Sequence, residues 1–98
     1  MYLHIVMMAF NTEVTAALHE SIEQCLADTR DQCEGVLRFE LVRNQSQTSA
    51  RYSHALLSVF ASEQALDAYR TSAAHEAMMA RLGRHIAQIV VLDSPLTD

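Results

Sequence analysis

Tyr69 and His75, six residues apart in the segment YRTSAAHEAMM, are the side chains best suited to acid–base chemistry. A neutral imidazole, with a pKa of about 6.5, can remove a proton next to a carbonyl group at neutral pH. A phenol, with a pKa of about 10, can donate a hydrogen bond to the enolate oxygen that then forms. On an unbroken helix the two side chains would diverge by about 120°. A break at Thr71 and Ser72 is therefore needed to turn them toward one site.

The alternative interpretation is that Tyr69 fills the core and His75 hydrogen-bonds near a helix start. Two further histidines, His4 and His54, fall in predicted strands that are expected to be antiparallel neighbours. Both lie early in their strands, so we expect them toward opposite ends, flanking a cavity or satisfied within the core. The candidate ligand-binding residues around the pair are His4, Val6, Met8, His54, Leu56, Met78 and Met79. Flexible methionines suit either a core or a tolerant apolar pocket.

Metal binding has little support in the sequence. His75 and Glu76 are followed by methionines where the zinc-peptidase pattern His-Glu-x-x-His requires its second histidine. Neither Cys25 nor Cys33 has a neighbouring base that would mark a nucleophile. Glycine-rich phosphate loops and serine-centred elbows are also missing. We therefore expect neither a metal nor an organic cofactor.

Length and charge bound the remaining possibilities. The chain has 98 residues, which is one domain spanning 1–98, and a net charge of −5 with no lysine. Its seven arginines are scattered, which argues against nucleic acid as a partner. No apolar run reaches the roughly 18–20 residues of a membrane span, and the N-terminus does not resemble a signal peptide. We expect a cytoplasmic protein with reduced thiols, and no membrane association.

The first half of the chain predicts a strand, a helix and a second strand. Residues 2–10 carry apolar side chains on both faces, so each face should be covered. Thr15 can cap an amphipathic helix of roughly 15 residues. Residues 36–44 alternate, which places Leu37, Phe39 and Leu41 on one side and Arg38 and Glu40 on the other.

The second half predicts a strand, two helical segments and a last strand. Residues 44–51 form a polar loop, and 52–60 form the third strand. Ser62 and Ser72 can each cap a helix, and the second of these helices runs to Leu82. Gly83 suits the left-handed position that ends a helix. Residues 85–93 form the last strand, followed by a short tail in which Pro95 prevents extension.

The order β-α-β-β-α-β predicts a ferredoxin-like α+β sandwich with a four-stranded antiparallel sheet and the helices on one face. That arrangement leaves the other sheet face bare. Half of the residues are hydrophobic and only 19% are charged, which is rich for a small monomer. We expect two copies to pack their bare faces together as a homodimeric α/β barrel.

With this order, the chain resembles the stress-responsive A/B-barrel (Dabb) family. The resemblance covers nearly the whole chain, and its motifs are LHIV at 3–6, YSHAL at 52–56, FASEQALDAY at 60–69, AAH at 73–75 and IVVLD at 89–93. Members of the family are homodimeric ferredoxin-like barrels. One similar protein, the plant enzyme olivetolic acid cyclase, closes a polyketide thioester by an aldol reaction without a cofactor.

The resemblance implies roles for individual residues. The catalytic tyrosine and histidine of that cyclase correspond to Tyr69 and His75, and its two strand histidines correspond to His4 and His54. The family pattern His-Pro-Ala-His is here Ser72-Ala73-Ala74-His75, which leaves the pair intact but alters the turn. The leading expectation is a homodimer that binds a small apolar carbonyl or phenolic compound and enolises or cyclises it. A non-catalytic stress-associated or ligand-binding protein and a cofactor-free monooxygenase of the dimeric-barrel type are the alternatives.

Overall fold

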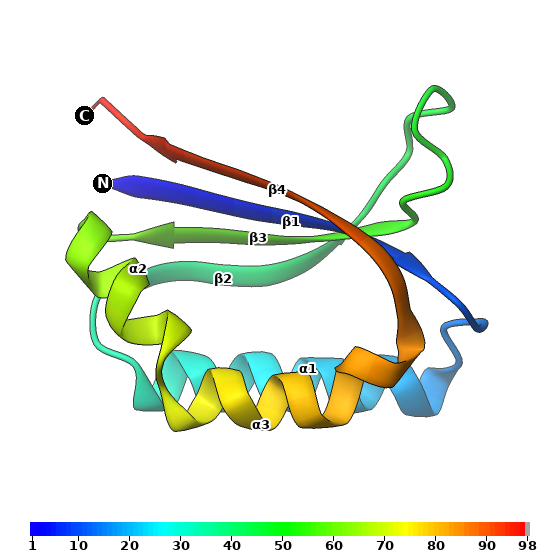
Figure 1. The fold of residues 1–98 in the computed structure, drawn as a ribbon, viewed down its shortest axis with the longest axis horizontal. Coiled ribbons are helices and arrows are strands. Elements are labelled where there is room, and N and C mark those ends of the chain that lie inside the picture. The colour runs from blue at the N-terminus through cyan, green and yellow to red at the C-terminus, as the bar shows by residue number, and fades with distance from the viewer. Residues whose placement is uncertain (98) are drawn as a thin grey trace.

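One antiparallel sheet and three α-helices make up the fold (Figure 1). The structure is a computed structural model that describes residues 1–97. The strand order across the sheet is β2-β3-β1-β4. In chain order the elements are β1 (Tyr2–Phe10), α1 (Ala16–Gln32), β2 (Val36–Arg43), β3 (His54–Phe60), α2 (Glu63–Arg70), α3 (Ala73–Leu82), the 3₁₀ turn η1 (Gly83–His85) and β4 (Ile86–Pro95). The predicted ferredoxin-like α+β fold is confirmed.

Each helix begins at a hydroxyl side chain that accepts a backbone hydrogen bond. Thr15 accepts from the N–H of Leu18 at 3.2 Å, and Ser62 accepts from that of Ala65 at 3.1 Å. These bonds satisfy donors that the first turn of a helix leaves unpaired. Within residues 1–97, no helix combines the length and apolar character needed to cross a bilayer.

Ser72 produces the predicted break between α2 and α3. Its hydroxyl donates to the carbonyl oxygen of Tyr69 at 2.7 Å and accepts from the N–H of His75 at 3.1 Å. One hydroxyl therefore ends α2 and starts α3. The change of direction lies between the two residues that the sequence pairs chemically.

The helices lie on one face of the sheet and close the core there (Figure 1). Its fully buried side chains come from α1, β2, β3 and α2 and include Ile22, Leu26, Phe39, Phe60 and Leu66. Residues of the opposite parity face away from the helices. We call this surface the bare face, made of Leu3, Ile5, Met7, Leu57, Val59, Val90 and Leu92. Val90 is 49% exposed and Leu92 is 52% exposed, which is unusual for large aliphatic side chains in a strand.

The predicted alternation of β2 fails at Leu37. A register irregularity separates Val36, which pairs with Phe60, from Arg38, which pairs with Val59. Leu37 is the extra residue, and it is 53% exposed instead of joining Phe39 in the core. A bulge inserts one residue that the partner strand does not match, so simple parity cannot be carried across it.

The prediction that Gly83 takes a left-handed conformation is wrong. Its φ of −54° and ψ of −40° are right-handed, because α3 continues directly into η1. The only glycine with positive φ in the described part of the chain is Gly35, at 78°. An added Cβ at Gly35 would lie 2.7 Å from that of Ala65, so this turn requires glycine for two reasons.

Two strand boundaries differ from the prediction by two residues, and the end of β2 and the start of β4 differ by one. β3 starts at His54, two residues later than expected, because Asn44 and Ser53 close the preceding loop by a backbone bond. β4 continues to Pro95, which pairs with Tyr2. A proline is tolerated there because β4 is an edge strand, where no neighbour needs its N–H.

Candidate functional site

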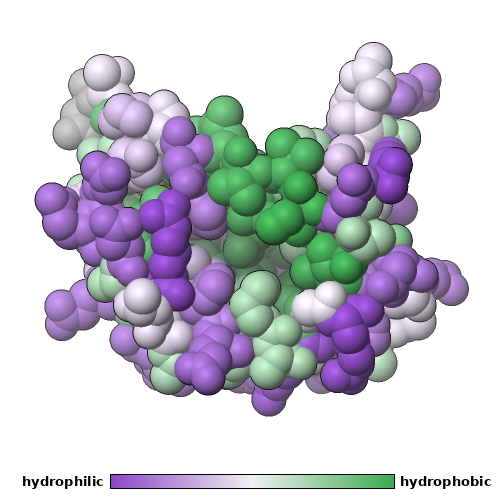
Figure 2. All heavy atoms as spheres, viewed as in Figure 1, coloured by the Kyte–Doolittle hydropathy of each residue, from purple (hydrophilic) through white to green (hydrophobic). Residues whose placement is uncertain are grey.

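A cavity of about 540 Å³ lies between the sheet and helices α2 and α3. We call it the main cavity. Figure 2 shows it as a recess lined by apolar residues in the middle of the molecule. All but one of the predicted site residues line it, namely His4, Val6, Met8, Leu56, Tyr69, His75, Met78 and Met79. Its remaining wall comes mainly from β4, through Ile89 and Val91 among others. Polar side chains are therefore a minority of this lining.

Tyr69 and His75 meet at the cavity wall. Their ring centroids are 5.0 Å apart with an interplanar angle of 83°, an edge-to-face contact. Tyr69 comes from the last turn of α2 and His75 from the first turn of α3, so the Ser72 break brings them together. Within residues 1–97, neither the Tyr69 hydroxyl nor the His75 imidazole has a hydrogen-bond partner. Both groups are free to bond to a ligand.

Burial shifts the pKa values of Tyr69 and His75 in opposite directions. Burial raises the pKa of Tyr69, and the neighbouring thiols of Cys33 and Cys25 raise it further, so the phenol keeps its proton. Burial lowers the pKa of His75, and the His4 imidazole and the Arg70 guanidinium lower it further. At neutral pH the pair thus consists of a hydrogen-bond donor and an unprotonated base.

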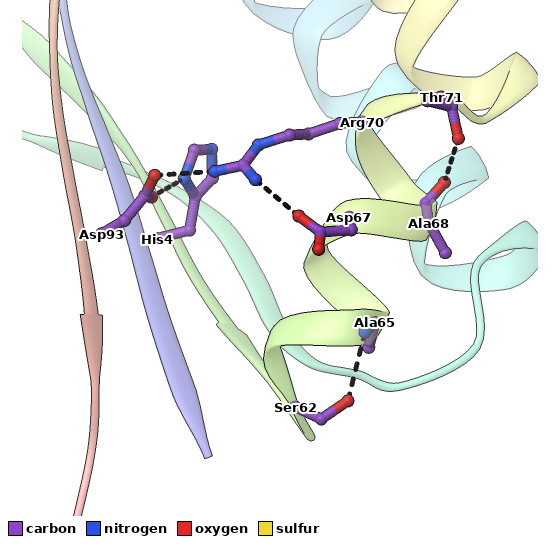
Figure 3. Close-up of polar contacts among 8 residues, drawn as sticks. All are labelled: His4, Ser62, Ala65, Asp67, Ala68, Arg70, Thr71 and Asp93. Atoms are coloured by element: carbon purple, nitrogen blue, oxygen red, sulfur yellow. Dashed lines mark hydrogen bonds and ion pairs between the residues drawn. The ribbon is translucent and has the colours of Figure 1, made fainter.

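A chain of polar contacts fixes His4 on the sheet side of the main cavity (Figure 3). His4 Nδ1 is bonded to one carboxylate oxygen of Asp93 on β4, its direct partner in the β1–β4 pairing. The other oxygen of Asp93 accepts from Arg70 of α2 at 2.7 Å, and Arg70 also donates to Asp67 at 2.8 Å. A carboxylate can only accept, so the proton of a neutral His4 ring lies on Nδ1. Its Nε2 is left as an acceptor.

His4 also belongs to the aromatic cluster behind Tyr69. Its ring lies 6.4 Å from that of Tyr69 and 6.4 Å from that of Phe60, both edge to face. Its backbone oxygen accepts from the buried hydroxyl of Ser58 at 2.6 Å. Packing on one side and Asp93 on the other leave His4, 8% exposed, little freedom to rotate. The site therefore combines three polar rings on a rigid support.

His54 does not line the main cavity, although it was expected among the ligand-binding residues. The pairing places it opposite Met8, four residues along β3 from Ser58, which is opposite His4. The two strand histidines therefore lie toward opposite ends of the sheet, as the strand directions predicted. His54 is bonded to Ser53 at 2.7 Å and packs edge-on against Phe10 at 5.5 Å.

Arg70 and Asp93 also belong to the site, although the sequence pattern did not single them out. Asp93 is the one charged residue in the apolar stretch IVVLD, which is the available signal, but its partner lies 89 residues away. Arg70 lines the main cavity and directly follows Tyr69 in the chain, but the sequence shows it only as one of seven scattered arginines. Within residues 1–97 there is no group of three histidine, cysteine or acidic side chains that could hold a metal ion.

Fold and site together define a ferredoxin-like α+β domain with a ligand-sized cavity between sheet and helices. The Stress responsive A/B Barrel Domain family (Dabb) matches residues 3–96, so the chain belongs to this family. No curated protein sequence matches it significantly.

Solved structures agree with the fold. A dimeric ferredoxin-like protein of unknown function from Jannaschia sp. has a TM-score of 0.84 and 24% identity, with 97% of this chain and 98% of that chain covered. A protein from Arabidopsis thaliana has a TM-score of 0.84 and 20% identity, covering 100% and 97%. Hydroxynitrile lyase from Passiflora edulis has a TM-score of 0.82 and 14% identity, covering 99% and 94%. At these identities the likeness concerns the fold alone.

Proposed function

We propose that this protein binds a small, largely apolar carbonyl or phenolic compound in the main cavity and enolises or cyclises it by cofactor-free proton transfer. The observation that carries the proposal is the contact between Tyr69 and His75, two polar rings without protein partners at the wall of an apolar cavity. The volume of about 540 Å³ lies in the range of small-molecule sites, about 300–1,000 Å³.

His75 acts as the general base in this proposal. Its neutral imidazole removes the proton from the carbon next to the carbonyl group; the electron pair of that C–H bond forms the C=C bond of the enolate, and the π pair of the carbonyl group moves to its oxygen. Tyr69 donates a hydrogen bond to this oxygen while its charge develops. Because burial disfavours the tyrosinate, Tyr69 stabilises the enolate without giving up its proton. The imidazolium of His75 then returns its proton, so the residues end as they began.

His4 supplies the second polar anchor. With Nδ1 bonded to Asp93, only Nε2 can accept a hydrogen bond from a phenolic or enolic hydroxyl of the ligand. A ligand that bonds to both His4 and Tyr69 and carries two carbonyl groups would have its enolate carbon near the second carbonyl group. Attack of that carbon closes a ring by an aldol reaction. This is the reaction type that the resemblance to olivetolic acid cyclase implies.

The acting unit in this proposal is a homodimer that packs two bare faces together. Exposed Val90 and Leu92 support it, because aliphatic strand surfaces of this kind are normally covered. The similar protein from Jannaschia sp., described as dimeric, supports it as well.

The test measures exchange of carbon-bound protons for deuterium in a panel of polyketide-like β-keto thioesters. The wild-type protein should accelerate exchange, and Tyr69→Phe or His75→Ala should lower the rate by about 10²-fold or more. Tyr52→Phe and His19→Ala change the same residue types outside the main cavity and should leave the rate unchanged. Equal rates for all five proteins would end the proposal.

Ligand-binding and oxygen-consumption measurements on the same proteins separate the two alternatives. A ligand that binds without any exchange, in the wild type as in the variants, would identify a non-catalytic binding protein. Consumption of dissolved oxygen with a quinol-like compound would identify a cofactor-free monooxygenase instead. Both outcomes are read from the intact protein and need no knowledge of the natural ligand.

A further inference from the structure

A second hollow, of about 660 Å³, lies at the end of the sheet where His54 is found. It is built from the segment before α1, the end of β2, the loop 44–53 and the start of β3. The residues that matter here are Thr15, His19, Arg43, Arg51, Ser53 and His54. Polar and basic groups dominate this lining, in contrast to the apolar main cavity. The acid–base proposal uses none of these residues.

Positive charge is concentrated at the second hollow. Arg43 and Arg51, like Arg30, Arg81 and Arg84, form no ion pair with a carboxylate in residues 1–97, so both guanidinium groups are available to a ligand. Only one acidic residue, Glu13, is part of the lining. The chain as a whole carries −5, but this hollow has two guanidinium groups against a single carboxylate. An anion entering there would meet a local charge opposite in sign to that of the protein.

His54, which lines the second hollow, is held in a defined orientation. Its Nδ1 lies 2.7 Å from the Ser53 hydroxyl, and its ring packs edge-on against Phe10. Burial lowers the pKa of His54, and Arg43 and His19 lower it further, which keeps the free ring neutral. When Ser53 donates to Nδ1, the neutral ring carries its proton on Nε2. His54, 9% exposed, then offers a hydrogen-bond donor to the hollow.

The loop that carries Arg51 is also held in place. The side-chain amide of Asn44 donates to the carbonyl oxygens of Ser49 at 3.0 Å and Tyr52 at 2.8 Å. The backbone N–H of Asn44 donates to Ser53 at 2.9 Å. These bonds tie both ends of the loop together, so Arg51 is positioned beside the end of β2.

We propose that the second hollow is a binding site for a phosphate-class anion, with Arg43 and Arg51 as its cationic ligands and His54 as a neutral donor. A guanidinium group donates paired N–H bonds to the oxygens of a phosphate group or a carboxylate. A phosphate group has more oxygens than a carboxylate, so it can accept from two guanidinium groups and a histidine at once. The 17-residue helix α1 begins at the hollow and has no acidic side chain in its first turn, which favours an anion further.

Inorganic pyrophosphate is the probe, with acetate as the comparison anion. Calorimetric titration of the wild-type protein should show saturable pyrophosphate binding, and the imidazole resonances of His54 and His19 should move in NMR spectra. The imidazole resonances of His4 and His75, which line the main cavity, should not shift. Acetate that binds as tightly as pyrophosphate, or resonances that move at the main cavity instead, would overturn the proposal.

Three single substitutions localise the binding. Arg43→Gln and Arg51→Gln should each weaken pyrophosphate binding about tenfold, the loss of one charge-assisted hydrogen bond. Arg84→Gln removes the same charge from an exposed residue outside the hollow and should change affinity less than twofold. Equal weakening by all three variants would mean unspecific attraction and would refute the site. Because Arg51 is exposed in a loop, its variant is expected to fold. The rate of proton–deuterium exchange in the β-keto thioesters, which depends on the main cavity, should be the same as in the wild type.

Discussion

Replacing Asp93 by asparagine tests the polar chain that orients His4. Asp93 accepts hydrogen bonds from His4 and from Arg70, and its side chain is 28% exposed. Asparagine has nearly the same shape but no charge. The bond from His4 would change from charge-assisted to neutral, a loss of about 1–1.5 kcal/mol. The half-exposed contact with Arg70 would add about 0.2–1 kcal/mol.

The expected total for Asp93→Asn is therefore about 2 kcal/mol. For a domain of this size that corresponds to a decrease in Tm of about 8–16 °C. Asp67→Asn is the matched control, because Asp67 bonds only to Arg70 and its side chain is 62% exposed. Its cost should stay below about 1 kcal/mol.

Thermal unfolding at fixed protein concentration measures both variants, and ¹⁵N NMR reports which nitrogen of His4 carries the proton. An amide can donate to Nδ1 instead of accepting from it, so the proton should shift toward Nε2 in Asp93→Asn. Equal Tm values for the two variants, together with an unchanged His4 tautomer, would show that Asp93 does not orient this ring.

Two further predictions concern pH and assembly. His54 and His75 both have lowered pKa values, so the unfolded chain binds protons more readily than the folded one. The free energy of unfolding should thus decrease as pH falls through about 6.5, and a urea midpoint that does not move between pH 7.5 and 5.5 would contradict the assigned burial. On the bare face, Leu92→Asp should convert dimers into monomers in sedimentation experiments, while Ala27→Asp on the exposed surface of α1 should not. A Leu92→Asp protein that remains dimeric would place the interface elsewhere.

Most of the fold could be predicted because its signals are local. Hydroxyl residues before each helix and the two apolar faces of β1 are readable within a few positions, and the structure has the elements in the predicted order. Leu37 and Gly83 were assigned wrongly for the opposite reason. The conformation of each depends on how neighbouring elements join: a bulge against β3 at Leu37, and the direct passage of α3 into η1 at Gly83.

The candidate site divides in the same way. The cap at Ser72 is readable, so the contact between Tyr69 and His75 could be anticipated from the break between their helices. Asp93 could not be assigned to His4, because that requires the exact register of β1 against β4, the first and last strands in the chain. The separation of His54 from His4 was anticipated from strand direction, but the cavity each residue lines depends on the helices above.

Strand β4 takes part in both the main cavity and the bare face. Its side chains alternate between the main cavity, through Ile89 and Val91, and the bare face, through Val90 and Leu92. β4 is an edge strand and is hydrogen-bonded to β1 on one side. No strand among residues 1–97 supports it on the other side. A surface that packs against Val90 and Leu92 also restrains the wall that a ligand meets. In the proposed homodimer, ligand affinity and subunit association would therefore be thermodynamically linked, and dilution of the protein should weaken ligand binding.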